Sequence, residues 1–304
     1  MLAPSRRSVL LGTAGLLALT ACGGEDTSTT GKAVPVLGMS AIPDQDPELL
    51  NRLHPVLAKR FATDTGLDVE YKPVTDYAAV VRAFEVGDIH LAWMGGLTGV
   101  QARSRVPGAT AIAQRDIDAD FHSLFIATKD SGLQPFQDAS GLTSLAGHTL
   151  TYGSDTSTSG RLMPQHFMAE GGLDPADLKG SPGFSGSHDA TIEAVASGSF
   201  EVGAVNEQVW KATQEAGEVD LSNVVVLWRT PGYADYHWLV RPDVDDVFGA
   251  GTTKSITDLL LGLDAGTPDD KAILDLFGAA SFVATKDSNY DQIEAVAKEQ
   301  GLLA

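Results

Sequence analysis

The sequence is poor in cysteine, in positive charge and in long apolar runs. Cys22 is the single cysteine among 304 residues, so the chain cannot close an internal disulfide. The 21 lysines and arginines stand against 40 aspartates and glutamates, and this balance argues against a surface for nucleic acids or anionic membranes. A buried anion site stays possible, because such a site binds through local dipoles. After residue 22 no hydrophobic run approaches the ~20 residues of a membrane span.

Motifs of catalysis and of metal binding are missing as well. The chain has no Gly-x-Ser-x-Gly elbow, no His-Glu-x-x-His pattern and no cluster of cysteines or other metal ligands. A hydrolase that uses Ser157, Ser159 or Ser185 with His188 is the enzymatic alternative, but it needs a positioned nucleophile, base and orienting group. We therefore expect no enzyme, no cofactor and no metal.

The N-terminus has the features of an export signal. Arg6-Arg7 precedes an apolar run from Val9 to Leu19, and small residues follow, so residues 1–21 are expected to be a signal peptide. Its start resembles a twin-arginine signal, although the general export route stays open. Leu19-Thr20-Ala21-Cys22 resembles the lipobox of bacterial lipoproteins, in which the cysteine receives the lipid; a buried cysteine after an uncleaved helix is the alternative. Residues 22–32 would then form a lipidated tether on the outer face of the cytoplasmic membrane.

Strand and helix patterns alternate along the rest of the chain, which predicts an α/β protein. A first unit with a largely parallel sheet is expected from strands 34–39, 69–74, 89–94 and 109–113 and helices 47–65, 77–86 and 97–105. A second unit is expected from strands 122–128, 148–152, 200–205 and 224–228 and helices 161–170, 190–197 and 206–215. A strand at 237–240 and three helices at about 246–263, 269–279 and 288–300 complete the prediction.

The turn Gly153–Gly160 carries the strongest functional signal. It lies between a predicted strand and a predicted helix, where the first backbone N–H groups of the helix have no partner and favour an anion. A single serine there is most often only an N-cap. Four consecutive hydroxyl residues, Thr156 to Ser159, exceed what a cap requires, so the turn is predicted to hold an anion.

Four segments together resemble the substrate-binding proteins of phosphonate/phosphite-type ABC transporters. They are Thr75–Val81, Leu91–Gly96, Ser157–Pro164 and Gly186–Ala190, in this order along nearly all of residues 34–303. Three further segments look closest to a subgroup assigned to selenate transport: Phe184–Thr191, Asn206–Trp210 and Ala272–Leu276.

The resemblance implies a two-lobed type II periplasmic-binding-protein fold with hinge crossovers. One lobe would comprise residues 33–122 plus 238–304, and the other residues 123–237. The hinge would lie near His122–Thr128 and Tyr236–Val240. The implied function is the capture of a small tetrahedral oxyanion between the lobes for the permease and ATPase subunits of an importer. The family also implies a monomer. A lipoprotein that senses the ligand for a signalling partner is the alternative, since the same cleft could dock a sensor kinase.

The resemblance also implies site residues. Ser157, Thr158 and Ser159 match the family's anion-holding turn, and His188 matches its site histidine. Tyr77 would close the site from the first lobe, and Gly95 lies at a strand exit beside it. Taken alone, His188 is more often a surface residue, and Tyr77 is as well explained by core packing. Trp93, Gln114 and Arg115 lie at comparable strand ends, with core or surface roles as alternatives.

Two acidic residues are expected near the ligand. Asn206 and Glu207 end a predicted strand, and Asp235 and Tyr236 lie near the second crossover, where the family places a carboxylate. An ionised carboxylate only accepts hydrogen bonds. Asp235 or Glu207 in the site would therefore favour a protonated phosphorus oxyanion or an aminophosphonate. If both face away, a fully ionised ligand such as selenate is favoured instead.

Overall fold

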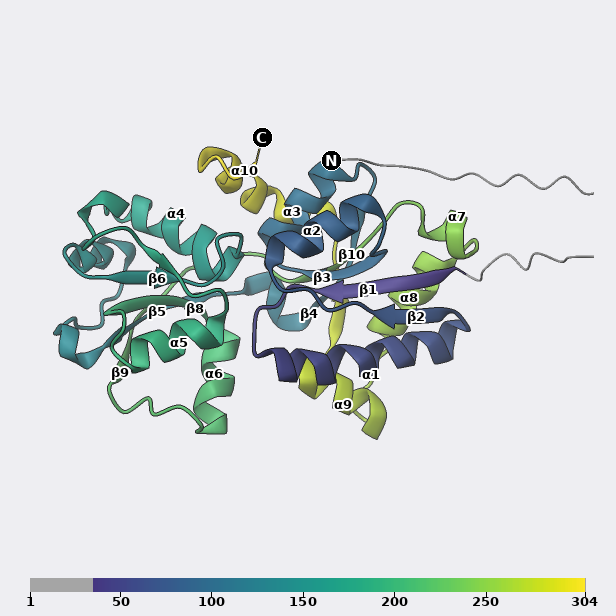
Figure 1. The fold of residues 1–304 in the computed structure, drawn as a ribbon, viewed down its shortest axis with the longest axis horizontal. Coiled ribbons are helices and arrows are strands. Elements are labelled where there is room, and N and C mark those ends of the chain that lie inside the picture. Colours follow the sequence, from purple (N-terminus) through teal and green to yellow (C-terminus); the bar gives the residue numbers. More distant parts are fainter. Residues whose placement is uncertain (1–34, 304) are drawn as a thin grey trace, which may run out of the picture. The chain divides into compact units, whose positions relative to one another are not determined.

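The computed structural model describes residues 35–303, which contain two β-sheets and the helices that cover them (Figure 1). The predicted signal peptide, the lipidation at Cys22 and the tether of residues 22–32 lie outside this part of the chain. Among residues 35–303, none of the helices combines the length and the hydropathy needed to cross a membrane. We call the part built on the six-stranded sheet the first lobe and the part built on the five-stranded sheet the second lobe.

The first sheet is mixed and not largely parallel. Its strand order is β11-β4-β10-β3-β1-β2. β1 pairs in parallel with β2 and β3 as predicted, but β10 lies antiparallel between β3 and β4, and β11 pairs antiparallel with β4. The prediction was wrong because β10 and β11 come from the end of the chain, which re-enters the sheet from the opposite direction. The strands are β1 (Val36–Ala41), β2 (Asp68–Tyr71), β3 (Leu91–Met94), β4 (Thr110–Arg115), β10 (His237–Val240) and β11 (Phe282–Ala284).

The second sheet has the order β7-β6-β8-β5-β9. β5 runs antiparallel to both of its neighbours, whereas β6 is parallel to β7 and β8. The strands are β5 (Ser123–Thr128), β6 (Leu150–Tyr152), β7 (Gly183–Phe184), β8 (Val202–Asn206) and β9 (Val224–Arg229). The two sheets are joined by residues 116–122 and 230–236, which pair at an isolated bridge between Phe121 and Tyr233. The predicted hinge segments 122–128 and 236–240 therefore lie mostly inside strands, directly beyond these connections.

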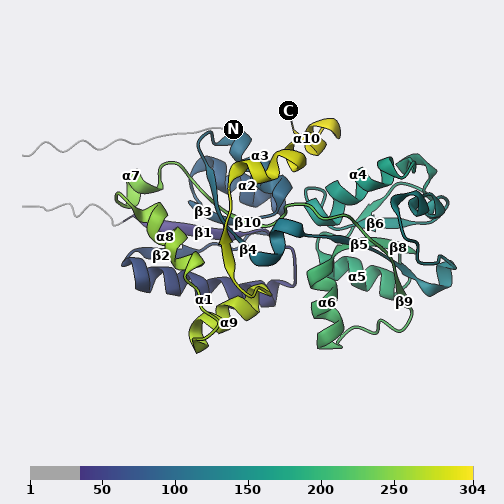
Figure 2. The same ribbon diagram turned by 180° about the vertical axis from the view of Figure 1, so that it is seen from behind.

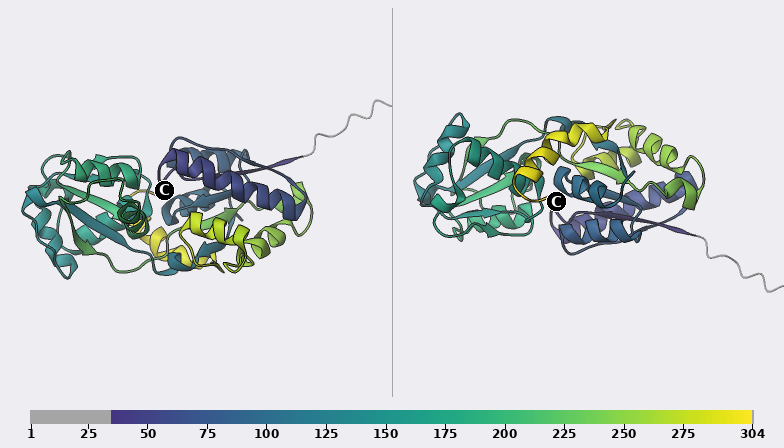
Figure 3. Two further views of the ribbon diagram at one scale, coloured as in Figure 1. Left: turned by 90° about the horizontal axis from the view of Figure 1, so that it is seen from below. Right: turned by 90° about the horizontal axis from the view of Figure 1, so that it is seen from above.

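Helix α1 (Pro47–Thr65) shows how local sequence signals set an element's ends. The carboxylate of Asp46 accepts hydrogen bonds from the N–H groups of Glu48 and Leu49, and Gly66 ends the helix in the left-handed conformation. The bounds predicted from the sequence are confirmed. The apolar side of α1 packs on the first sheet together with the C-terminal helices, as the left view in Figure 3 shows.

The remaining helices cover both faces of the two sheets (Figure 2). They are α2 (Tyr77–Val86), α3 (Gly96–Arg105), α4 (Met163–Glu170), α5 (His188–Ala196), α6 (Glu207–Ala216), α7 (Val244–Phe248), α8 (Thr252–Leu261), α9 (Pro268–Phe277) and α10 (Asp291–Glu299). The predicted helix 246–263 is two helices, because Gly249 and Gly251 both take a positive φ that ends α7 and resets the chain. The short strand β11 was not predicted.

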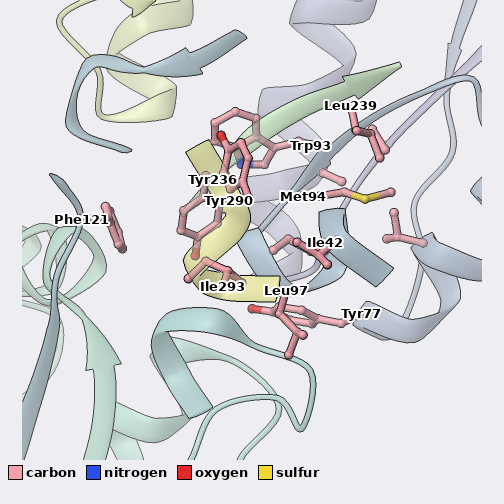
Figure 4. Close-up of a cluster of buried hydrophobic side chains, with 14 of the residues drawn as sticks. Ile42, Tyr77, Trp93, Met94, Leu97, Phe121, Tyr236, Leu239, Tyr290 and Ile293 are labelled. Atoms are coloured by element: carbon pink, nitrogen blue, oxygen red, sulfur yellow. The ribbon is translucent and has the colours of Figure 1, made fainter. Parts of the chain in front are cut away.

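Aromatic side chains fill the first lobe where it meets the connections. Trp93 on β3 stacks on Tyr236 with ring centroids 5.6 Å apart and an interplanar angle of 20°. Trp238 and Phe277 pack against the same indole. Figure 4 shows Trp93, Tyr236 and Tyr290 gathered in this cluster, with Tyr77 farther along it. This packing gives the side chains at the ends of β3 and β10 a rigid support.

Candidate functional site

The hydroxyl-rich turn forms the start of a distorted helix, as the sequence predicts. Ser157 is its N-cap, and its Oγ accepts a hydrogen bond from the N–H of Gly160 at 2.9 Å. The turn Thr158–Leu162 is wider than an α-helix, because the N–H of Leu162 bonds back to the carbonyl of Ser157. Pro164 follows in the first turn of α4, where it supplies no N–H. Ser157, Thr158 and Ser159 are all buried, so their hydroxyls face the interior of the protein.

The start of helix α3 meets this turn. The N–H of Leu97 donates to Thr158 Oγ1 at 2.9 Å, and the N–H of Gly96 donates to Asp235 Oδ1 at 2.9 Å. A Cβ on Gly95 would lie 3.1 Å from Thr158 Oγ1 and 3.2 Å from Asp235 Oδ1. Glycine at position 95 therefore allows the first lobe to approach both oxygen atoms. Two helix starts, one from each lobe, bring their positive ends to the same place.

Asp235 is a buried carboxyl group with one free oxygen. Its Oδ1 accepts the hydrogen bond of Gly96, while Oδ2 has no partner among residues 35–303. Burial raises the pKa of Asp235 to about 7, although the Gly96 N–H group and the hydroxyls of Thr158 and Ser159 oppose that rise. Near neutral pH both forms of the group are therefore populated: the ionised carboxylate accepts hydrogen bonds, and the protonated carboxyl group can donate one.

His188 begins helix α5 and is completely buried. Its Nδ1 lies 3.3 Å from the N–H of Asn206 and accepts that hydrogen bond, which assigns the ring proton to Nε2. Nε2 lies 3.5 Å from both Ser159 Oγ and Tyr236 Oη. Burial lowers the pKa of His188 to about 3, so the imidazole is neutral and offers one N–H. A Cβ on Gly160 would lie 3.0 Å from the ring, so glycine is needed here too.

Asn206 and Tyr236 extend this network across the connection between the lobes. Asn206 caps α6 through its Oδ1, which accepts from the N–H of Val209 at 2.6 Å. Its amide donates to Tyr236 Oη at 3.0 Å. Tyr77 is buried at the start of α2, and its hydroxyl has no hydrogen-bond partner within the described residues. Burial raises the pKa of both tyrosines well above the usual value, so both hydroxyls keep their protons.

Glu207 does not join this group. It forms ion pairs with Arg229 at 2.9 Å and with Lys211 at 3.0 Å, toward the outside of the second lobe. Burial alone would raise its pKa, but the hydrogen bonds and charges of the two cations hold the pKa below its usual range. The expectation that Glu207 lies at the ligand is not supported by its contacts. The preceding residue, Asn206, caps α6 with its side chain, whereas Glu207 in the first turn of the helix is held by the two cations.

Arg115 is buried but already paired. Its guanidinium binds Asp118 through two nitrogens, at 2.7 and 2.8 Å, and lies 4.8 Å from the centre of the Tyr236 ring. Arg115 therefore supports the Tyr236 ring and does not offer a free charge to an anion.

Asp44 is a buried acid beside Tyr236 that the sequence did not single out. Its pKa is raised to about 6 by burial, which a hydrogen bond from Tyr236 and the charge of Arg115 partly offset. Asp44 lies in the loop after β1 with no motif around it. The placement of that loop opposite α5 depends on the tertiary fold, so the sequence held no signal for it.

These features define a class of protein before any relative is considered. Two α/β lobes, joined by two connections, enclose a buried set of hydroxyls, helix starts, a neutral imidazole and a carboxyl group. This is the architecture of a two-lobed solute-binding protein of type II.

Comparison with known proteins agrees with this class. The family model of the periplasmic substrate-binding proteins of phosphonate ABC transporters matches residues 39–290. The probable ABC transporter phosphite binding protein PhnD1 of Prochlorococcus marinus (strain MIT 9301) is 41% identical over 265 residues, covering 87% of this chain and 89% of that protein. The phosphonates-binding periplasmic protein of Escherichia coli (strain K12) is 25% identical over 226 residues, covering 73% of this chain and 64% of that protein.

A solved structure of a relative also agrees with this class. The structure of PhnD1 from Prochlorococcus marinus (MIT 9301) in complex with methylphosphonate has a TM-score of 0.86 and 40% identity, and the match covers 88% of this chain and 98% of that one. The chain belongs to the phosphonate family of periplasmic substrate-binding proteins of ABC transporters. It is an extracytoplasmic binding protein that works with the permease and ATPase of an importer, and it is not an enzyme.

Proposed function

We propose that this protein captures a small phosphorus oxyanion of the phosphonate or phosphite class between its lobes. The residues that would contact the ligand are Tyr77, Gly95, Ser157, Thr158, Ser159, His188, Asn206, Asp235 and Tyr236. The observation that carries the proposal is the free Oδ2 of the buried Asp235, beside donors from the turn at Ser157–Ser159.

The donor side accounts for binding to an oxyanion. The hydroxyls of Ser157 and Ser159, the first N–H groups of the wide turn and the Nε2 proton of His188 can all donate. Donors held in place by the fold stabilise an anion without a matching full charge. The donor set therefore suits a compact anion with several oxygen atoms.

The acceptor side accounts for the choice among oxyanions. Asp235, when ionised, repels a fully ionised anion but accepts a hydrogen bond from a P–OH group. Arg115 cannot compensate a second ligand charge, because it is paired with Asp118. The site therefore favours a ligand that carries a proton near neutral pH, such as a phosphonate or phosphite. Sulfate and selenate, which are fully ionised, are disfavoured.

Calorimetric titration tests this proposal. The purified protein is titrated at pH 7 with phosphite, methylphosphonate, aminoethylphosphonate, phosphate, sulfate and selenate. We expect phosphite or methylphosphonate to bind most tightly and sulfate and selenate at least about a hundredfold more weakly, a difference of ~3 kcal/mol. Tightest binding of selenate would refute the proposed ligand class.

We further propose that one lobe comprises residues 33–122 plus 238–304, that the other comprises residues 123–237, and that the lobes close over the ligand. The strand membership of the two sheets supports these lobe bounds.

We also propose that Cys22 anchors the protein by a lipid. The lipobox-like segment Leu19–Cys22 supports this anchor. A Cys22→Ser variant expressed in the native host is expected to leave the membrane fraction; unchanged membrane association would contradict the anchor.

A further inference from the structure

Two hydrogen bonds, both donated by backbone N–H groups, join the loop before α1 to the start of α5. The N–H of His188 donates to the carbonyl of Asp44 at 3.1 Å. The N–H of Asp46 donates to the carboxylate of Asp189, with 2.6 Å between the nitrogen and Oδ2. The loop leads out of β1 in the first lobe, and α5 covers the second sheet. Both bonds therefore pass from one lobe to the other.

The same turn of α5 also faces the site. The side chain of His188 points to Ser159 and Tyr236, and the next residue, Asp189, points to the opposite lobe. Asp189 is only partly buried, and none of its hydrogen bonds reaches the hydroxyl turn. It is thus adjacent to the proposed ligand site along the chain but binds a different partner.

The surroundings of Asp189 make the Asp46 N–H its principal stabilising partner. The acidic groups around its carboxylate are Asp44, Asp46 and Glu193, which carry charge of the same sign as Asp189. Arg52 lines the same cavity, but no ion pair joins it to Asp189 among the described residues. The start of α1, with Asp46 as its N-cap, supplies the compensating N–H and the positive end of a long helix. If the lobes separate, Asp189 loses this partner and keeps its acidic neighbour Glu193. The contact therefore stabilises the closed arrangement specifically.

We propose that Asp189 is an affinity-determining latch residue, which holds the lobes together through the Asp46 N–H without touching the ligand. This inference rests on the proposed function of the same site. A contact made only in the closed conformation raises the closed fraction, and apparent ligand affinity scales with that fraction. The latch acts mainly on ligand release, because it forms after the ligand has entered.

The first experiment removes the acceptor. Binding and release of methylphosphonate are measured by stopped-flow intrinsic fluorescence in the wild type, in Asp189→Ala and in Asp189→Asn. For Asp189→Ala we expect release to be roughly tenfold faster, because a charge-assisted hydrogen bond is lost. The association rate should change less than about twofold. Asp189→Asn keeps an acceptor oxygen, so we expect roughly threefold faster release. An unfolded or weakened α5 would instead lower the thermal midpoint of the ligand-free protein and slow association.

The second experiment removes the donor. Asp46 has φ −52°, which a proline can adopt, so Asp46→Pro deletes the N–H with little backbone change. Asp46→Ala is the matched control, since it loses the helix cap but keeps the N–H. We expect Asp46→Pro to release methylphosphonate roughly tenfold faster than Asp46→Ala does. In the Asp46→Pro background, Asp189→Ala should add less than about twofold, because the two changes break one bond.

The outcomes separate the latch from the ligand class. A wild-type protein that binds none of the phosphorus oxyanions would contradict the proposed function, whatever the variants do. A wild type that binds methylphosphonate, with equal release rates in Asp189→Ala, would overturn the latch alone. Additive effects of Asp46→Pro and Asp189→Ala would overturn it as well, since independent effects mean separate contacts.

Discussion

The two faces of the site differ in the chemistry that they present. The second-lobe face consists of donors: the hydroxyls of Ser157–Ser159, the helix start behind them and the neutral imidazole of His188. The opposite face has two buried carboxyl groups, Asp44 from the first lobe and Asp235 from a connection between the lobes, whose pKa values burial raises to about 6 and about 7. The donor face can bind any compact oxyanion, whereas the acid face requires a ligand that brings a proton. Affinity and selectivity are therefore expected to depend on different residues.

Removal of the imidazole should have the largest effect on affinity. His188→Ala deletes the Nε2 donor and the acceptor of the Asn206 N–H, both in a dry interior. We expect all oxyanions that bind the wild type to bind about a hundredfold more weakly, or ~3 kcal/mol, in calorimetric titration. A loss confined to one ligand would show that the donor face is not general. Circular dichroism and the thermal midpoint serve as controls for folding.

Asp235→Asn should change selectivity more than affinity. The new amide oxygen can still accept from the N–H of Gly96, while the amide N–H takes the place of the free Oδ2. We expect the ratio of the Kd for selenate to the Kd for methylphosphonate to fall at least about tenfold, or ~1.4 kcal/mol. The measurement is a pair of titrations at pH 7. An unchanged ratio would mean that Asp235 does not face the ligand.

The two faces should also respond to pH with opposite sign. The folded pKa of Asp235 is above its unfolded value, so the folded state holds more protons and stability falls as pH rises from 5 to 7. The folded pKa of His188 is below its unfolded value, so stability is lost as pH falls through 6.5 toward 5. Relative to Asp235→Asn, the free energy of unfolding of the ligand-free wild type should fall by about 2 kcal/mol between pH 5 and 7. Relative to His188→Gln, it should rise by about 2 kcal/mol over the same range. Urea unfolding at several pH values measures both differences, and slopes of the same sign would contradict the assignment.

Glu207→Gln should have the smallest effect. Its ion pairs with Arg229 and Lys211 lie near the surface, where such pairs contribute less than about 1 kcal/mol. We expect the Kd for methylphosphonate to change less than about twofold, which makes this variant a control for the other substitutions. A loss of affinity comparable to that of His188→Ala would mean that Glu207 contacts the ligand after all.

Local signals explain what the sequence predicts well. The bounds of α1 and α2 follow from Asp46 and Asp76 as caps and from Gly66 and Gly87 as stops. The start of α4 follows from consecutive hydroxyl residues and a proline. Contacts between distant segments explain the failures. The insertion of β10 between β3 and β4 and the pairing of β11 depend on where the chain returns, which no local pattern contains.

The same limit applies to the site. The Ser157–Ser159 turn could be named because it lies at a predicted helix start, whereas His188 could be named only because it matches the family's site histidine. Asn206 and Glu207 are neighbours at a strand end, and the sequence could not tell which of them faces inward. Asp44 lay in a loop with no pattern around it, so its role depends on tertiary packing alone.

The meeting of the α3 start with Thr158 has a consequence for cargo hand-over. Partial charges on backbone N–H groups act over short distances, and water replaces them readily once a gap opens. If the Leu97 N–H and Thr158 Oγ1 moved apart by the width of one water molecule, their hydrogen bond would break and water would solvate both helix starts. An opening of the lobes by that distance is therefore expected to weaken ligand binding sharply.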